Sequence, residues 1–223
     1  MNKRNYQKEM EKILERLPKD EQAQEVKHLL LHSCCAPCSS YVLDYLSHYF
    51  RITVFYYNPN ITASAEYFKR VDEQKRLIEV FNEQPGRYPI DCMEGDYRPA
   101  QFLNLTKGLE ECPEGGERCF ICYRMRLEET AKVASEIGAD YFTTTLTISP
   151  LKNAQKLNEI GEELAAIYES CWLPSDFKKK EGYKKSVELS AEYGLYRQDY
   201  CGCAFSKAER ERSERMKNQT EEI

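Results

Sequence analysis

Seven of the ten cysteines in this chain fall into three short groups. The groups are H-S-C-C-A-P-C at residues 32–38, R-C-F-I-C at residues 118–122 and Y-C-G-C at residues 200–203. Their cysteines are Cys34, Cys35, Cys38, Cys119, Cys122, Cys201 and Cys203. A single cysteine is usually a small buried apolar residue, but seven thiols at such short spacings favour metal binding or redox chemistry.

The composition indicates that these cysteines are in a reducing compartment. The chain has 223 residues, and 32 Lys and Arg against 37 Asp and Glu give a formal charge of −5. Residues 1–24 lack the apolar core of a secretory signal, and no segment reaches the roughly 18 apolar residues of a membrane helix. We therefore expect a cytoplasmic protein with no membrane partner, in which a disulfide framework is disfavoured. The remaining cysteines, Cys92, Cys112 and Cys171, stand alone and are interpreted as structural.

The first two cysteine groups have spacings typical of a metal site. Cys34 and Cys35 follow a predicted strand and precede a helix that starts near Pro37, where the helix dipole favours thiolates. Cys119 and Cys122 open another predicted helix and lie one turn apart on the same face. Four sulfurs from two helix starts match the Cys₄ requirement of an iron–sulfur cluster or of zinc. Adjacent cysteines fit poorly at two corners of one zinc tetrahedron, so the spacing favours either a larger cluster or a pair in which one thiol faces elsewhere.

The third group differs from the other two because only one residue separates its cysteines. A C-x-C pair is too short for comfortable chelation of one metal, but the glycine between Cys201 and Cys203 allows the backbone to bend into a labile disulfide. A dithiol that opens and closes stores two electrons. The alternative, that both residues are additional cluster ligands, remains open.

Apolar patterns along the chain predict strands that alternate with helices. Strands are predicted at residues 28–33, 52–57, 88–91 and 141–146, with another short strand at 170–173. Helices are predicted at about 36–49, 63–82, 99–105, 119–137, 157–167, 183–193 and 204–216. Alternation of this kind produces βαβ units and a mostly parallel sheet.

The predicted fold class is therefore α/β, with a Rossmann-like parallel sheet flanked by helices and extra helices at both ends. Residues 1–27 are predicted to form an N-terminal helical extension, and residues 28–223 a single α/β domain. Ligands of such sheets bind outside the carboxyl ends of the strands. The first cysteine group follows the first predicted strand directly, so it lies at that position.

Six longer stretches resemble the epoxyqueuosine reductase family of the QueH type. They are L-H-S-C-C-A-P-C (31–38), Y-N-P-N-I (57–61), E-Y-F-K-R (66–70), P-E-G-G-E-R-C-F-I-C-Y-R-M-R-L (113–127), F-T-T-T-L-T-I-S-P-L-K (142–152) and Y-R-Q-D-Y-C-G-C (196–203). Together they extend over almost the whole chain from residue 28 onward, and they are far more specific than a lone C-x-x-C. The family's usual proline after N-P-N-I-x is replaced by Ala63, and residues 1–27 are an addition to the pattern.

The resemblance implies an oxidoreductase that completes queuosine synthesis in the cytosol. Its substrate would be tRNA with epoxyqueuosine at the anticodon wobble position, and its reaction would remove the epoxide oxygen by a two-electron reduction. The implied fold is similar to that of the adenine-nucleotide α-hydrolases. Those proteins place a phosphate loop after strand one, whereas C-C-A-P-C stands there in this chain, so ATP use is disfavoured. The sequence does not identify the electron donor.

The resemblance also assigns roles to the cysteine groups. It implies that a [4Fe–4S] cluster is bound by Cys34, Cys35, Cys119 and Cys122. It makes Cys201 and Cys203 the redox-active pair, and it associates Cys38 with further metal binding. Whether an additional iron accompanies the cluster is left open. Asp199, two residues before Cys201, is a candidate proton donor to the departing oxygen, with an ordinary exposed loop aspartate as the alternative.

An acidic chain needs a local basic surface to bind tRNA phosphates. The segment 178–185 is rich in lysine. Lys178, Lys179 and Arg197 are the candidates for contacts with the phosphate backbone of the tRNA. Further candidates flank the second cysteine group, and these are Arg118, Arg124 and Arg126. A lysine run that is simply solvated is the alternative.

The end of the second predicted strand supplies candidates for binding the modified base. Tyr57 is a candidate for stacking on a flipped base, as are Tyr196 and Tyr200. Asn58 and Asn60 are candidates for hydrogen bonds to the substrate. Core packing of Tyr57 and a turn formed by the two asparagines are the alternatives.

Two other functions remain as alternatives. One is a non-catalytic module, either zinc-stabilised or a thiol redox sensor, which would lack the visible absorbance of an iron–sulfur protein. The other is an ATP-dependent tRNA thiolase-like enzyme, which the missing phosphate loop disfavours.

Overall fold

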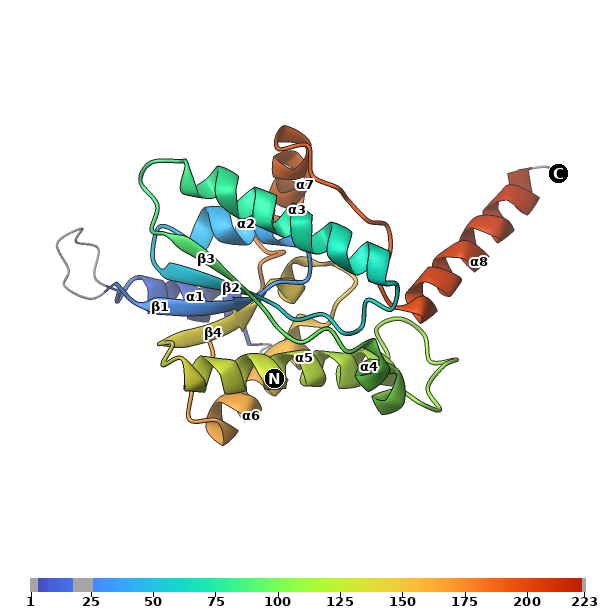
Figure 1. Cartoon of the computed structure of the whole chain (residues 1–223), viewed down its shortest axis with the longest axis horizontal. Coiled ribbons are helices and arrows are strands. Elements are labelled where there is room, and N and C mark those ends of the chain that lie inside the picture. Colours follow the sequence, from blue (N-terminus) through green and yellow to red (C-terminus); the bar gives the residue numbers. More distant parts are fainter. Residues whose placement is uncertain (1–3, 18–25, 222–223) are drawn as a thin grey trace.

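The computed structural model describes residues 4–17 and 26–221. Its centre is a sheet of four strands in the order β3-β2-β1-β4, in which every neighbouring pair is parallel (Figure 1). The strands are β1 (His28–His32), β2 (Arg51–Tyr56), β3 (Ile90–Glu94) and β4 (Tyr141–Thr144). The predicted α/β class with a Rossmann-like parallel sheet is confirmed. All four strands end at the same edge of the sheet, and this edge positions the cysteine groups.

Helices cover both faces of the sheet (Figure 1). The helices are α1 (Tyr6–Leu14), α2 (Ala36–Leu46), α3 (Ser64–Asn82), α4 (Pro99–Leu105), α5 (Glu117–Glu136), α6 (Ala154–Ile167), α7 (Gly182–Glu192) and α8 (Ala204–Glu221), with a 3-10 helix η1 (Thr145–Ile148) after β4. α2 packs against α3 and α7, while α5 packs against α6, β1 and β4. The connections between parallel strands therefore form the βαβ units expected from the sequence.

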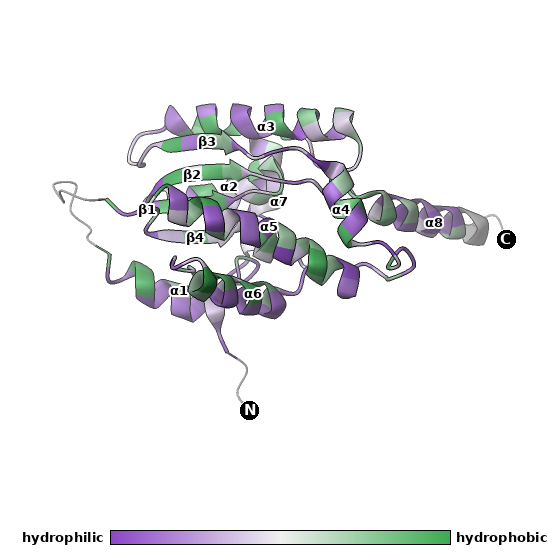
Figure 2. Ribbon diagram, turned by 60° about the horizontal axis from the view of Figure 1, so that its bottom comes forward, coloured by the Kyte–Doolittle hydropathy of each residue, from purple (hydrophilic) through white to green (hydrophobic). Residues whose placement is uncertain are grey.

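The two faces of the sheet have separate apolar cores because side chains alternate along a strand. In β1, Leu29 and Leu31 belong to the core shared with α2 and α3, whereas Leu30 belongs to the core shared with α5 and α6. All three leucines are fully buried. Figure 2 shows β1 and β2 as mainly apolar strands that lie between the helices. Burial on both faces explains why the strand sequence is a continuous apolar run.

The strand predicted at residues 170–173 is wrong in extent. The structure has an isolated parallel bridge between Phe142 and Trp172 there. Phe142 donates to the Cys171 carbonyl at 2.8 Å and accepts from the Leu173 amide at 2.9 Å. Pro174 follows at once, and because proline has no amide hydrogen the ladder cannot continue.

Both ends of the described chain carry a helix. Met10 and Leu14 of α1 are buried in the core that contains α2. α8 begins directly after Cys203 and projects away from the sheet and its covering helices (Figure 1). Among the described residues, no helix combines the length and the apolarity that are needed to cross a membrane.

Candidate functional site

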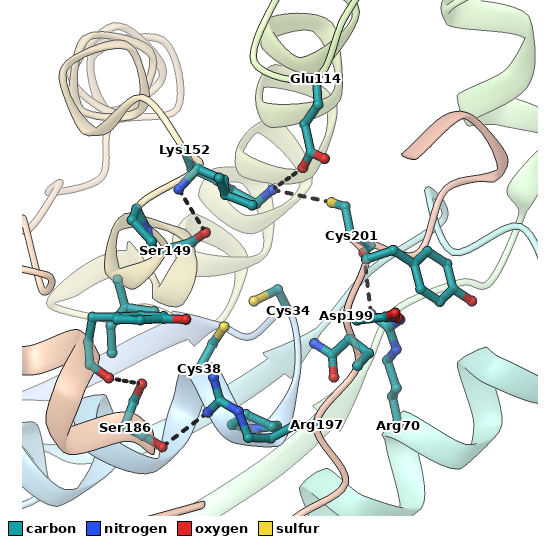
Figure 3. A pocket seen from close by; sticks show the side chains of 17 residues that line it. Cys34, Cys38, Arg70, Glu114, Ser149, Lys152, Ser186, Arg197, Asp199 and Cys201 are labelled. Atoms are coloured by element: carbon teal, nitrogen blue, oxygen red, sulfur yellow. Dashed lines mark hydrogen bonds and ion pairs between the residues drawn. The ribbon is translucent and has the colours of Figure 1, made fainter. Parts of the chain in front are cut away.

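The cysteine groups surround two adjoining cavities at the carboxyl edge of the sheet. The outer cavity has a volume of about 350 Å³, and its lining includes Cys34, Cys38, Arg197, Asp199, Tyr200 and Cys201 (Figure 3). The inner cavity is a small void of about 10 Å³, and its lining includes Cys119, Cys122, Cys201, Cys203, Asn60 and Arg126. Cys201 and Lys152 border both cavities. The arrangement places the cysteines of distant sequence segments around one continuous site.

The first cysteine group follows β1 and forms the start of α2. The sulfurs of Cys34, Cys35 and Cys38 all lie within 4.8 Å of one another, and they form a potential metal site. Cys35 is the residue before the first helical turn, and its sulfur lies 3.8 Å from that of Cys34. The Thr145 hydroxyl, at the end of β4, donates to the Cys34 sulfur at 3.4 Å and accepts from its backbone amide at 3.2 Å. Two neighbouring strand ends therefore hold this group in place.

Hydrogen bonds couple the ionisation of the three thiols of the first group. Hydrogen bonding from the Cys34 and Cys38 thiols holds the pKa of Cys35 well below its usual value. Hydrogen bonding to Cys35 raises the pKa of Cys34, and hydrogen bonding to Cys34 and Cys35 strongly raises the pKa of Cys38. The helix start was expected to favour thiolates throughout this group, but without a metal the three sulfurs are too close for all of them to ionise. A bound cation would remove that conflict.

The second cysteine group lies in the first two turns of α5. The sulfur of Cys119 accepts a hydrogen bond from the Gly115 amide at 3.3 Å, as expected at a helix start. Cys122 lies one turn further on and is buried. Burial raises the pKa of Cys122 to about 12, so its thiol is neutral until a metal displaces the proton. Both sulfurs face the inner cavity, as their spacing predicted.

The third cysteine group depends on a bent backbone at its glycine. Gly202 has φ +113°, and a side chain there would place Cβ 2.8 Å from Ile61. Glycine is therefore required both by the backbone angle and by the space. Cys201 and Cys203 are both free thiols. The Cys201 sulfur accepts from the Lys152 ammonium at 3.3 Å, and the Cys203 sulfur contacts the Ser206 hydroxyl at 3.3 Å.

The structure divides the four expected cluster ligands between two neighbouring groups. Cys34 and Cys35 lie with Cys38, whereas Cys119 and Cys122 line the inner cavity. Cys201 and Cys203 line the inner cavity as well. Among residues 4–17 and 26–221, Cys34, Cys35 and Cys38 are the single set of three or more ligand-type side chains within 4.8 Å of one another.

Lys152 is a buried cation between the cysteine groups that the sequence analysis did not select as a site residue. The Lys152 ammonium lies 3.3 Å from the Cys201 sulfur and 3.7 Å from a Glu114 carboxylate oxygen (Figure 3). Its side chain is 8% exposed. Burial lowers the pKa of Lys152, but its interactions with Cys201, Tyr123 and Glu114 together outweigh burial, and the net pKa is well above the usual value. Lys152 therefore carries a positive charge at the boundary of the two cavities.

The three arginines that flank the second cysteine group were expected to contact RNA, and for two of them the structure contradicts this. Arg118 and Arg126 are 2% and 1% exposed. Arg118 donates to the carbonyl oxygens of residues 109 and 110, which fixes the loop before α5. Arg124 is on the surface but pairs with Glu163 at 2.9 Å. The burial of Arg126 could have been predicted from its spacing, because positions 119, 122 and 126 share one face of a helix.

The donor set of this site fits a thiolate-bound metal centre. It offers seven thiols, which are soft ligands suited to iron–sulfur clusters and zinc. It also contains two buried cations, Arg126 and Lys152, and the Arg126 Nη2 atom has no hydrogen-bond partner. Because an unpaired buried charge is costly, this lining favours an anionic occupant. A cluster held by thiolates is anionic, whereas neutral thiols leave Arg126 without a counter-charge.

The candidates at the end of β2 are buried. Tyr57 is 4% exposed, stacks on Phe55 and donates to the Gln101 side chain at 3.1 Å. Asn58 donates to the Ser33 carbonyl at 2.8 Å, which fixes the loop that leads to the first cysteine group. These contacts favour the structural interpretation of both residues. Asn60 is also buried, but its Oδ1 atom is unpaired and the residue lines the inner cavity.

The other predicted residues lie around the outer cavity or beside it. Asp199 lines the cavity, with its side chain 61% exposed and 3.4 Å from Arg210. Arg197 also lines it and donates to the Ser190 hydroxyl at 2.9 Å. It donates as well to the Ser186 carbonyl at 3.3 Å (Figure 3). Lys178 and Lys179 lie on a neighbouring cavity that shares the segment 150–152 with the outer one.

His32, beside the first cysteine group, belongs to the core. Its Nε2 atom donates to the Tyr57 carbonyl at 3.1 Å, so its Nδ1 atom accepts from the Thr144 hydroxyl at 2.8 Å. Burial and the nearby Arg126 charge lower the pKa of His32 to about 3. The neutral ring therefore connects the ends of β1, β2 and β4 through hydrogen bonds.

Comparisons with known proteins agree on one family. A family model described as "Epoxyqueuosine reductase QueH" matches residues 29–209. Proteins named epoxyqueuosine reductase QueH are 44% identical in Staphylococcus epidermidis, over 91% of this chain and 84% of that protein, and 42% identical in Streptococcus pyogenes, over 88% and 77%. The one from Thermotoga maritima is 35% identical over 82% of this chain and 91% of its own length.

One solved structure has a related outline. It is the "U34-tRNA thiolase NcsA from Methanococcus maripaludis with its [4Fe-4S] cluster". It aligns with 89% of this chain and 67% of its own, at a TM-score of 0.49 and 12% identity. Similarity at this level carries no functional argument.

Proposed function

This chain belongs to the QueH family of epoxyqueuosine reductases, and we propose that it reduces epoxyqueuosine in tRNA to queuosine. The observation that carries the proposal is the thiol-lined double cavity, whose residues all lie within the matched span 29–209. The modified base is at the wobble position of the anticodon, in a loop whose bases can be splayed out into a pocket. We place the reaction in the cytoplasm, with electrons from a donor that remains to be identified.

The reaction sets the chemical requirements of the site. Conversion of the epoxide to an alkene breaks both carbon–oxygen bonds, consumes two electrons and two protons, and releases the oxygen as water. The enzyme must therefore deliver electrons and protons to the same small group while the rest of the tRNA lies outside. The outer cavity is open to solvent and is lined by Cys34, Cys38 and Cys201, which suits a base inserted from an RNA loop.

We propose that a [4Fe–4S] cluster is bound here by Cys34, Cys35, Cys119 and Cys122. When bound, such a cluster supplies single electrons and a Lewis-acidic iron. The protein contributes the buried cations Arg126 and Lys152, which offset the charge of the ionised thiols. Cys38 lies within the first sulfur group and is available to an additional iron.

The pair Cys201 and Cys203 matches the stoichiometry of the reaction. Closing two thiols to a disulfide releases two electrons and two protons, the same numbers that epoxide removal consumes. Cys201 borders both cavities, so it lies between the proposed cluster site and the substrate space. The Lys152 ammonium fixes its sulfur on that boundary. An external reductant then has to reopen the disulfide before the next turnover.

Asp199 remains the candidate for proton delivery. It lines the outer cavity near Cys201 and is open to solvent, so it can exchange protons with water. Its partner Arg210 comes from α8 and orients the carboxylate. A carboxyl group in this position can pass a proton to the departing oxygen.

The proposed function is tested by anaerobic turnover. Metal-loaded protein is incubated with a chemical reductant and tRNA that carries epoxyqueuosine, and the nucleosides are then analysed by mass spectrometry. We expect loss of one oxygen atom from the modified nucleoside, with queuosine as the product. Unchanged epoxyqueuosine in the presence of an intact cluster would contradict the proposal.

The basic residues beside the outer cavity give a prediction about tRNA binding. We expect the triple variant Lys178→Gln, Lys179→Gln, Arg197→Gln to bind tRNA more weakly at low salt. Each lost phosphate contact should reduce the slope of log affinity against log salt concentration by about one. Fluorescence titration over a range of salt concentrations measures this slope.

The control is Lys132→Gln, which removes a surface charge from α5 far along the helix from its cysteines. Lys132 has ion pairs with Glu129 and Glu136 on its own helix, both at 4.0 Å. Its replacement should leave the salt slope unchanged. If the triple variant has the same slope as the wild type, tRNA binds to another surface.

A further inference from the structure

Arg126 is a buried guanidinium without a carboxylate partner. Its residue is 1% exposed, and none of the salt bridges among residues 4–17 and 26–221 includes it. Its Nε atom donates to the Cys122 carbonyl at 3.3 Å, and its Nη1 atom donates to Asn58 Oδ1 at 3.4 Å. Both bonds are long, and the Nη2 atom has no partner. Because arginine does not lose its proton in proteins, this positive charge is permanent.

The other buried cations of the site differ from Arg126. Arg70 lies 2.7 Å from Glu66, and Lys152 lies 3.7 Å from Glu114. Arg126 lines the inner cavity together with Cys119, Cys122, Cys201 and Cys203. Its charge also interacts with Cys34 of the first group. Arg126 is thus positioned to interact electrostatically with all three cysteine groups.

This position has a thermodynamic consequence. A buried charge that lacks a counter-charge is destabilising, whereas the same charge beside ionised thiols is stabilising. Thiols are mostly neutral at pH 7, and cysteines bind a metal as thiolates. The contribution of Arg126 to the stability of the folded protein should therefore change from unfavourable to favourable when the centre is assembled.

We propose that Arg126 is the positioning residue that balances the charge of the cysteine-bound centre, so that it retains the centre and raises its reduction potential. The inference rests on the proposed function in that the centre is taken to be the redox cluster. Adding an electron makes the centre more negative, and a positive charge nearby stabilises that reduced form. Removal of the charge should lower the potential.

The test compares Arg126→Met, Arg126→Lys and Arg124→Met. Methionine keeps length and apolar bulk without charge, and lysine keeps the charge without the planar fork. Arg124→Met is the matched control because Arg124 lies two residues away on the same helix, on the surface, and pairs with Glu163. Each full-length protein is studied both metal-free under reducing conditions and after anaerobic cluster assembly.

Two measurements that do not depend on catalysis are made on each form. Urea unfolding gives the stability of the metal-free and metal-loaded proteins. A redox titration followed by electron paramagnetic resonance gives the reduction potential. For Arg126→Met we expect a higher urea midpoint without metal, a lower one with metal, and at least a tenfold loss in the equilibrium constant for reduction, which is about 59 mV for one electron.

The outcomes separate the possibilities. Arg126→Lys should retain most of the wild-type potential, and Arg124→Met should match the wild type in every measurement. If Arg126→Met is less stable than the wild type in both forms, or unfolds without metal, Arg126 has an ordinary structural role and the inference is overturned. An unchanged potential overturns it as well. If the wild type assembles no cluster at all, the proposed function fails instead.

Discussion

Replacement of Cys122 by serine is expected to reduce cluster content from about one per chain to near zero, and to abolish turnover with it. Cys122 is a buried residue of α5, one turn after Cys119, and its sulfur faces the inner cavity. A serine hydroxyl is a hard and weakly acidic ligand, so it is a poor substitute for a thiolate on iron. Iron and sulfide analysis of anaerobically purified protein, together with its visible absorbance, measures the loss.

A matched control separates ligand loss from a general effect of removing a thiol. Cys171→Ser removes an exposed cysteine that borders neither cavity. This variant should keep full iron content and turnover. Far-ultraviolet circular dichroism checks that both variants are folded. A folded Cys122→Ser protein that keeps its iron, sulfide and absorbance would exclude Cys122 as a ligand.

The double variant Cys201→Ser, Cys203→Ser is expected to keep its cluster and to lose turnover by at least about a hundredfold. The two thiols are free; Cys201 borders both cavities, and Cys203 lines the inner cavity. Without them the protein has no internal source of two electrons and two protons. Iron content and the rate of queuosine formation under multiple-turnover conditions measure the two parts of the prediction.

The comparison again uses a variant with the same number of changes. Cys92→Ser, Cys171→Ser removes two exposed cysteines and should leave iron content and rate unchanged. If the Cys201, Cys203 variant loses its iron together with its activity, the two residues are ligands of the metal centre. If it keeps both iron and full turnover, the dithiol has no part in the reaction.

Most of the sheet was predictable from local sequence because the strands are short and bounded by clear turns, and β1 and β2 are strongly apolar. β1 and β2 begin within one residue of their predicted positions. β3 begins two residues later than predicted, at Ile90, since its sequence is only partly apolar. The stretch 170–173 has the composition of a strand, but only one of its residues bridges to β4 before Pro174 ends the pairing. Local propensity does not reveal how many partners a segment will find.

By itself, the sequence determined which residue types carry the chemistry. Seven clustered cysteines, their placement after a strand and at helix starts, and the resemblance to one family were all readable from the printed chain. These features depend on spacing within a few residues, where the geometry of a helix or a turn fixes which side chains are neighbours. The family membership and the fold class followed from that local information.

The tertiary structure decided how the cysteines are shared and which charges face them. It places Cys201 on the boundary of two cavities and brings Lys152 to its sulfur, although 49 positions separate the two residues. It buries Arg126 beside the thiols, where the sequence had suggested contact with RNA. Burial and electrostatic contact arise only when segments distant in the chain pack together. Local spacing therefore predicts which groups can react, and packing determines which of them are charged, buried and within reach of one another.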